Sequence, residues 1–175
     1  MNAQLPIPGD AAARPIETSL QPAQARSASM QVCSFWLADR LFGVNILDVK
    51  EINKEVGFTR VYHAPKEVRG YVNIRGQIYL VLDLQMILGF EVTPVTAASR
   101  VVLFKPSVAE SLGVLVDRVS DIVQVAEGQV EWRDQPVDEH SRDNRRSLIA
   151  GDCKLPGKLI TLLDSRRLLG TILPS

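Results

Sequence analysis

Short apolar runs, broken by polar turns and glycines, recur along the chain from about residue 31. Residues 32–46 read as two β-strands, because β-branched and aromatic residues flank a short polar turn at 38–40. Residues 101–104 and 113–116 repeat this hairpin with a longer turn, and residues 70–83 give two more strands hinged at Gly76. This pattern predicts a mostly β protein of two small barrels, with few helices.

The second half of the chain repeats the pattern of the first. Residues 43–52 match residues 113–122 at an offset of 70 positions, and a second set of residues recurs at an offset of 81. The second set is Gly70, Gly76, Asp83 and Gly89, matched by Gly151, Gly157, Asp164 and Gly170. The difference between the offsets predicts an extra loop within residues 133–146 of the second copy. Units of about 60 to 70 residues hold only a marginal core alone, so the two copies are expected to pack around a shared one.

Two short helices are expected at equivalent places in the copies. Asp83 is placed to cap a helix over Leu84–Leu88, which Gly89 would end. Asp164 would cap a helix over Ser165–Leu169, ended by Gly170. Helices this short depend on packing against the sheets, because their propensity contributes little.

Residues 1–30 are expected to form a disordered tail. They are rich in Ala, Pro, Gln and Ser, and their isolated apolar residues cannot offset the entropy lost on ordering. Those apolar residues are Leu5, Ile7, Ile16 and Leu20, and the tail could include a short segment that binds a partner. An ordered domain is expected over 31–172, with one barrel at about 35–92 and the other at about 100–172.

Composition agrees with a globular protein. The chain is 46% hydrophobic and 23% charged, which excludes a wholly disordered chain. Its 20 basic and 20 acidic residues cancel, so no overall field draws it to nucleic acid or an anionic membrane. No apolar run approaches the roughly 20 residues of a membrane span, and the start lacks the pattern of a secretory signal. A cytoplasmic protein without membrane insertion is expected.

Several segments resemble the CheW family of chemotaxis coupling proteins. The matching segments are 42–52, 68–78, 82–84 and 113–117. Gly70 followed by Asn73-Ile74-Arg75-Gly76 is the most recognisable of them, and the resemblance covers about 31–172 but not the tail. It implies two five-stranded SH3-like barrels around a shared core, no catalytic activity and no cofactor. It also implies an adaptor role, joining the cytoplasmic tip of a methyl-accepting chemoreceptor to the regulatory domain of a CheA-type histidine kinase at membrane receptor arrays.

The resemblance also implies the binding residues. The receptor tip would dock in a groove between the barrels, while kinase contacts would use the barrel ends. By matching positions, the groove is expected to be lined by Val49, Glu51, Gly70, Asn73 and Arg75.

The residues themselves support an interaction role for this stretch. Gly70 and Gly76 let the backbone bend at both ends and so present Asn73 and Arg75 at a strand rim. The guanidinium of Arg75 suits carboxylates or carbonyls of a partner. The alternative is that Arg75 pairs with Glu51 within the fold and contacts no partner.

An enzyme is not favoured by the remaining residues. His63 and His140 lie in no metal-ligand spacing, and neither a phosphate-binding glycine loop nor a nucleophile elbow is present. Asp83 and Asp164 form a tempting carboxylate pair, but helix capping explains both. No catalytic residue and no metal site is therefore predicted.

A module that binds single-stranded nucleic acid remains the alternative, because small β-barrels often have this function. Such a site needs a positive groove with aromatic residues. Arg142, Arg145 and Arg146 cluster in one segment, but acidic residues lie among them and the aromatic content is only 6%. The cluster is more typical of a solvated loop.

Two cysteines and two tryptophans complete the candidate residues. Cys33 and Cys153 are expected to be buried thiols, since they lie in no paired motif. Trp36 is expected in the core. Trp132 would either close the second barrel, which is favoured, or be an exposed anchor for a partner.

Overall fold

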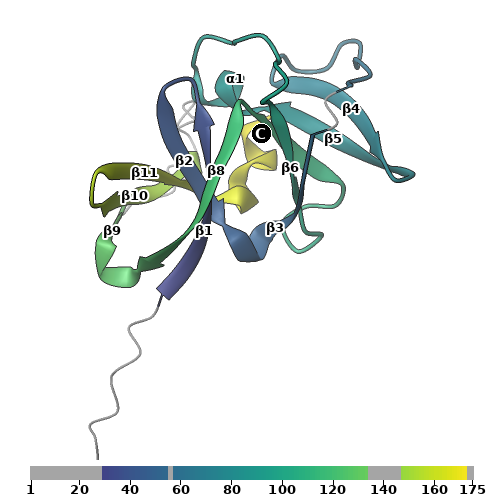
Figure 1. The fold of residues 1–175 in the computed structure, drawn as a ribbon. Coiled ribbons are helices and arrows are strands. Elements are labelled where there is room, and N and C mark those ends of the chain that lie inside the picture. The colour runs from purple at the N-terminus through teal and green to yellow at the C-terminus, as the bar shows by residue number, and fades with distance from the viewer. Residues whose placement is uncertain (1–28, 55–56, 134–146, 173–175) are drawn as a thin grey trace, which may run out of the picture.

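The part of the chain that the structure describes, residues 29–54, 57–133 and 147–172 of a computed structural model, forms eleven β-strands in two sheets (Figure 1). The first sheet has the order β8-β1-β2-β11-β10-β9. Its strands are β1 (Ser29–Leu37), β2 (Arg40–Asn45), β8 (Arg118–Ala126), β9 (Val130–Trp132), β10 (Ile149–Leu155) and β11 (Lys158–Leu163). The second sheet has the order β3-β6-β7-β5-β4. Its strands are β3 (Val49–Asn53), β4 (Val68–Ile74), β5 (Gln77–Asp83), β6 (Arg100–Phe104) and β7 (Leu112–Val116).

Each sheet combines strands from both copies of the repeat. The first sheet contains the β1–β2 hairpin of the first copy and four strands of the second copy. The second sheet contains the β6–β7 hairpin of the second copy and three strands of the first. The expected division into one barrel at 35–92 and another at 100–172 is therefore corrected: the copies exchange their first hairpins. The first sheet also has a sixth strand, the short β9.

The exchanged hairpins pair in the same way in the two sheets. Strand β2 runs parallel to β11, with Gly43 opposite Leu162, and β7 runs parallel to β5, with Gly113 opposite Val81. Gly43 and Gly113 are 70 positions apart, and Val81 and Leu162 are 81 apart, so both pairs follow the offsets of the repeat. The repeated sequence therefore builds two sheets related by an approximate two-fold axis.

The buried apolar residues form three groups, one within each sheet and one between the sheets. One lies in the first sheet and includes Val32, Cys153 and Ile160. A second lies in the second sheet and includes Tyr79. The largest joins residues of both sheets, among them Phe35, Phe104, Leu82 and Leu163. A shared core between the sheets is thus present, as the small size of each copy predicts.

The first helix forms as the sequence predicts. Helix α1 (Leu84–Leu88) begins at Asp83, whose Oδ1 accepts a hydrogen bond from the Met86 amide at 3.2 Å. It ends at Gly89, which has a φ of +74°.

The second helix differs from its prediction. Asp164 does cap, and its Oδ1 accepts from the Arg166 amide at 3.1 Å. However, the chain forms two short 3-10 helices, η3 (Ser165–Arg167) and η4 (Leu169–Thr171). Gly170 lies inside η4 and ends neither helix, because Leu168 keeps the chain right-handed between them. The expectation for Gly170 was wrong.

Other expectations are met in part. Strand β1 starts at Ser29, which pairs with Ala126, so residues 29 and 30 belong to the sheet and not to the tail. The rest of the tail, residues 1–28, lies outside the described residues, as do 134–146 with the arginine cluster and His140. Residues 46–48 and 127–129 form the short 3-10 helices η1 (Ile46–Asp48) and η2 (Glu127–Gln129).

The cysteines are buried as expected, but the tryptophans are not. Cys33 and Cys153 are free thiols, and burial raises the pKa of both above its ordinary value. Trp36 is only half-buried, with the Arg118 guanidinium 4.5 Å from the centre of its ring. Trp132 is 52% exposed because β9 is a short edge strand, so the favoured closing role is wrong.

Candidate docking site at the β4–β5 turn

A two-residue turn joins β4 to β5 at the exposed end of the second sheet. Ile74 pairs with Gln77 across it, and both residues of the turn have positive φ, +53° for Arg75 and +84° for Gly76. Such turns match the twist of a hairpin and normally carry Asn, Asp or Gly, which tolerate positive φ. Arg75 therefore occupies a conformation that costs about 1 kcal/mol or more for a residue with a Cβ. Strain of this kind concentrates at functional sites.

Asn73 holds the turn in place. Its side-chain Oδ1 accepts a hydrogen bond from the Gly76 amide at 2.9 Å. Asn73 thus stabilises the conformation that presents Arg75, a contribution that the sequence reading did not assign to it.

Arg75 is both paired and accessible. Its Nη1 lies 3.2 Å from Oε2 of Glu51, while 82% of its side chain is exposed to solvent. Glu51 is on β3 and Arg75 follows β4, the two edge strands of the sheet, so the ion pair spans from one edge to the other. An ion pair this exposed contributes little to stability, about 0 to 1 kcal/mol, and leaves the guanidinium donors largely available.

A connected polar network lies beside this ion pair. The Lys50 ammonium donates to the Tyr79 hydroxyl at 2.7 Å, and that hydroxyl donates to Gln77 Oε1 at 2.7 Å. Gln77 in turn donates through Nε2 to the Ser111 hydroxyl at 3.2 Å. The network fixes the side chains next to the turn. The alternation of Gln77 and Tyr79 on one face of β5 is the sequence signal that could have revealed it.

Apolar side chains lie on the same hairpin. Tyr71 is 42% exposed and Ile78 is 59% exposed. Ile78 is directly opposite Asn73, and Tyr71 precedes Asn73 by two residues, so all three project from one face of the sheet. Apolar anchors within a polar frame are the usual composition of a protein-docking surface.

The other two residues expected in the groove have supporting positions. Val49 is only 8% exposed and belongs to the shared core, where it precedes Glu51 by two residues in β3. Gly70 is buried, and its φ of +146° accompanies a close approach to the Thr59 carbonyl. Thr59 and Tyr71 exchange two backbone hydrogen bonds of 2.8 Å across this contact. The structure thus brings Glu51 and Asn73 to the turn that carries Arg75, whereas Val49 and Gly70 are buried.

The second copy repeats part of this arrangement. Lys158 Nζ lies 3.4 Å from Oδ2 of Asp121, a residue 70 positions after Glu51. The β10–β11 turn is Pro156-Gly157, with φ of +71° at Gly157, and carries no charged residue. Gly151 repeats the close approach of Gly70, since a Cβ there would lie 2.7 Å from the Glu131 carbonyl oxygen in β9. Only the first copy therefore presents an arginine at the turn.

The described residues, 29–54, 57–133 and 147–172, contain no cluster of side chains suited to metal binding. No group of three His, Cys, Asp or Glu side chains in these ranges could hold a metal ion. Asp83 caps α1 and lies 3.7 Å from Arg69, and Asp164 caps η3, so each has a structural partner. In the same ranges, no helix has the length and apolar character needed to cross a membrane.

Two curled sheets around a common core, with a strained, ion-paired turn on the surface, define a double β-barrel protein whose candidate site is a docking surface. Comparison with known sequences gives the family. A profile described as the CheW-like domain matches residues 31–172, and the chain belongs to this family.

Individual relatives agree with this assignment. The chemotaxis protein CheW of Rhizobium meliloti (strain 1021) is 30% identical over 145 residues, covering 83% of this chain and 88% of the relative. CheW of Helicobacter pylori is 26% identical over 140 residues, covering 80% and 81%. The crystal structure of the scaffolding protein TtCheW from Thermoanaerobacter tengcongensis matches with a TM-score of 0.67 and 25% identity, covering 78% of this chain and 90% of that one. These findings confirm the mostly β, SH3-like double-barrel fold and support a chemotaxis scaffold or adaptor role.

Proposed function

We propose that this protein is a non-enzymatic, cytoplasmic adaptor that couples the signalling tip of a methyl-accepting chemoreceptor to a CheA-type histidine kinase in membrane-associated receptor arrays. The observation that carries the proposal is the β4–β5 turn, where an exposed arginine is held at positive φ beside exposed apolar side chains. Membership of the CheW-like family gives this surface a partner class.

In the proposed complex, Arg75 and Glu51 contact the receptor directly, with Tyr71 and Ile78 as apolar neighbours. Asn73 keeps the turn in its binding conformation, while Val49 and Gly70 position β3 and β4. The Glu51–Arg75 pair can open at small cost because it is largely solvated. Arg75 can then donate to a carboxylate or carbonyl of the partner helix.

The kinase is proposed to bind elsewhere, at the end of the first sheet. Leu47 and Ile122 are 68% and 60% exposed, and a shallow pocket next to Leu47 is lined by Met30, Ile46 and Gln124. Separate surfaces allow both partners to bind at once. An adaptor of this kind transmits a signal by binding one arrangement of its partners better than another.

The receptor part of the proposal is tested by titrating the full chain with a soluble cytoplasmic fragment of its receptor in a calorimeter. Arg75→Ala is expected to weaken binding at least tenfold while the circular dichroism spectrum is unchanged. The matched control is Arg133→Ala, which removes an arginine paired with Asp152 at 2.7 Å on the other sheet and is expected to change binding less than twofold. Equal affinities for the two variants would mean that Arg75 contacts no partner.

The nucleic-acid alternative is tested in the same way. Binding of a labelled single-stranded oligonucleotide at low salt, weakening steeply as salt rises, would favour that function over the adaptor. The adaptor proposal expects no binding under these conditions.

A further inference from the structure

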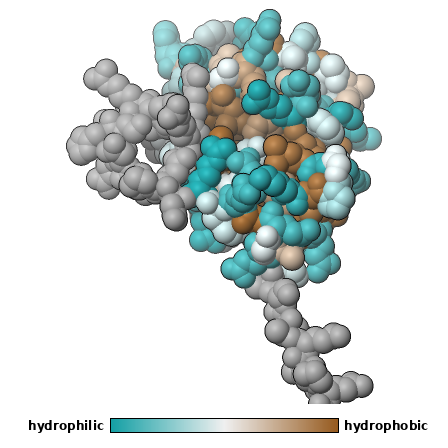
Figure 2. All heavy atoms as spheres, turned by 90° about the vertical axis from the view of Figure 1, so that its left-hand side faces the viewer, coloured by the Kyte–Doolittle hydropathy of each residue, from teal (hydrophilic) through white to brown (hydrophobic). Residues whose placement is uncertain are grey.

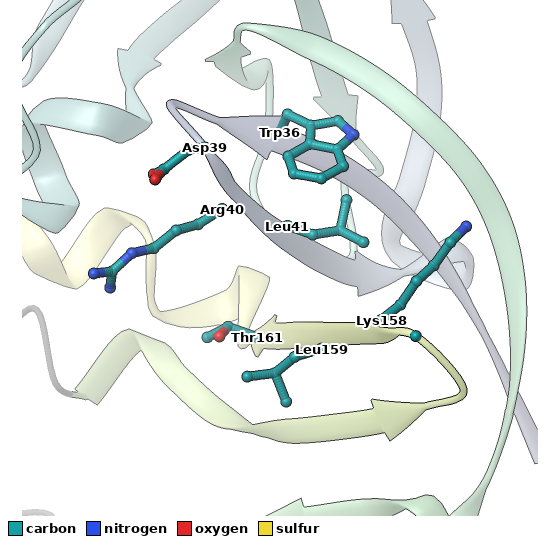
Figure 3. A pocket seen from close by; sticks show the side chains of 8 residues that line it. Trp36, Asp39, Arg40, Leu41, Lys158, Leu159 and Thr161 are labelled. Atoms are coloured by element: carbon teal, nitrogen blue, oxygen red, sulfur yellow. The ribbon is translucent and has the colours of Figure 1, made fainter.

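A hollow in the first sheet is not used by the docking site or by the proposed kinase surface. It has a volume of about 530 Å³ and lies between the β1–β2 and β10–β11 hairpins (Figure 3). Trp36 and Leu41 from the first hairpin line it together with Leu159 from β11. Figure 2, which faces this side of the molecule, shows hydrophobic surface exposed between hydrophilic side chains.

The equivalent place in the second sheet carries polar side chains. The repeat offsets place Gln77 where the hollow has Lys158, and Ser111 where it has Leu41. Gln77 donates through Nε2 to the Ser111 hydroxyl at 3.2 Å, which links β5 to the turn before β7. The first sheet has Lys158 and Leu41 at these places, and Lys158 pairs with Asp121 at 3.4 Å instead. Leu159 is 56% exposed, as is its counterpart Ile78 at 59%. The two barrels therefore differ at this place: the first has the apolar Leu41 where the second has the hydrogen-bonded Ser111.

Cationic side chains lie at the rim of the hollow (Figure 3), and the guanidinium of one of them, Arg40, is 5.6 Å from the centre of the Phe90 ring. Arg40 and Lys158 line the hollow, and the Arg118 guanidinium stacks on the Trp36 ring at 4.5 Å. One acidic residue, Asp39, also lines the hollow. Three more carboxylates lie near it and are already paired: Asp121 with Lys158, Asp152 with the lining residue Thr161, and Asp117 with the Ala38 amide. Among the lining residues, two are cationic and one is acidic, so a ligand with apolar side chains followed by a carboxylate complements the hollow.

We propose that the hollow binds a segment of the chain's own N-terminal region, Leu5-Pro6-Ile7-Pro8-Gly9-Asp10. This segment has two aliphatic residues, each followed by proline, and then a carboxylate. Proline restricts the backbone before binding, which lowers the entropy lost when an extended segment docks on an aromatic-lined surface. Leu5 and Ile7 contact Trp36 and Leu159, and the Asp10 carboxylate accepts from Arg40 or Lys158.

The connection to the hollow is long enough. Residues 11–28 separate Asp10 from Ser29, and these 18 residues span at most about 60 Å. Trp36 is on β1, the strand that begins at Ser29, so the distance to cross is within about 30 Å, the length of its nine residues. A tether of this kind gives the segment an effective concentration that reaches the millimolar range, so weak contacts suffice. This occupant is favoured over a separate partner for that reason.

The fluorescence of Trp36 tests the proposal in the full chain. Trp132→Phe leaves Trp36 as the only tryptophan. In this background, the double change Leu5→Ser/Ile7→Ser is expected to raise the acrylamide quenching constant of Trp36 at least twofold. The matched control, Ile16→Ser/Leu20→Ser, alters two other apolar residues of the same region and is expected to leave quenching unchanged.

A second experiment keeps the proposal falsifiable. A synthetic peptide of residues 1–12, added to the Leu5→Ser/Ile7→Ser variant, is expected to restore protection of Trp36, and a peptide with Asp10→Asn is expected to bind more weakly. Quenching that is equal in all variants, or that the peptide does not change, would overturn the proposal. Protection that rises with protein concentration would overturn it too, because it would assign the hollow to a second copy of the chain. Receptor titration is independent of these outcomes, since Arg75 lies on the other sheet.

Discussion

The side-chain amide of Gln85 donates to both carboxylate oxygens of Asp117, at 2.9 and 2.8 Å. Gln85 belongs to α1 of the first copy, and Asp117 joins β7 to β8 in the second. Asp117 also accepts from the Ala38 amide at 2.6 Å. A second such bond has its donor in the second copy and its acceptor in the first: the Ser165 hydroxyl in η3 donates to Asp48 at 2.6 Å. Polar contacts as well as strand exchange therefore join the two copies.

Removing the Asp117 carboxylate is expected to destabilise the protein. Asp117→Ala leaves the buried Gln85 amide and the Ala38 amide without this acceptor, at a cost of about 2 kcal/mol in the free energy of unfolding. Urea denaturation followed by circular dichroism measures the change. Asp39→Ala, at an exposed position in the adjacent turn, is the control and is expected to stay within about 0.5 kcal/mol. Equal stability of the two variants would mean that the bonds to Asp117 contribute nothing.

Alanine at Gly70 is expected to be more damaging than alanine at Gly76. Both glycines have positive φ, but a Cβ at Gly70 would collide with the Thr59 carbonyl, whereas nothing lies within 4 Å of a Cβ at Gly76. Gly76→Ala should cost about 1 kcal/mol for the backbone alone. Gly70→Ala adds the displacement of the Thr59 segment, so its thermal midpoint should be clearly lower. The reverse order would show that the Thr59 contact yields easily.

The two thiols are expected to be unreactive in the folded protein. Both are fully buried, and burial raises the pKa of each. Ellman's reagent at pH 8 should label them slowly in buffer and completely in guanidinium. Because the raised pKa keeps the folded thiols protonated, their contribution to stability is present at neutral pH and falls as pH rises through the range where unfolded cysteine ionises. Rapid labelling in buffer would contradict this burial.

The two copies are expected to fold only together. Cleavage between Ala97 and Ala98, both exposed, would separate β1–β5 from β6–β11. Each fragment then lacks the strands that its own sheet borrows, so residues 1–97 and 98–175 should each lack a cooperative melting transition. An equimolar mixture should regain one. A transition in either fragment alone would show that a copy can close a barrel by itself.

The sequence predicted local structure well because hairpins, caps and turns depend on neighbouring residues. Asp83, Gly89 and Gly76 could be assigned from their own segments, and the Glu51–Arg75 pair from its complementary charges. The exchange of hairpins could not, because the repeat is compatible with barrels built from contiguous or from exchanged strands. The Gln85–Asp117 contact depends on that exchange and was missed with it.

The exposure of the two tryptophans also could not be predicted from neighbouring residues. Apolar neighbours place Trp36 and Trp132 on strands, but exposure depends on which strand covers each one. Trp132 lies on an edge strand and Trp36 borders a hollow. Neither fact is encoded in the residues beside them.

The exchange of hairpins has a mechanical consequence. The chain passes from the first barrel to the second at residues 46–48 and returns at Asp117, so two crossings rather than one linker connect the barrels. The largest apolar core is packed between them and opposes any swivelling. Surfaces on opposite barrels are thus held at a fixed distance and angle. A partner that displaces the surface of one barrel therefore displaces the surface of the other barrel as well.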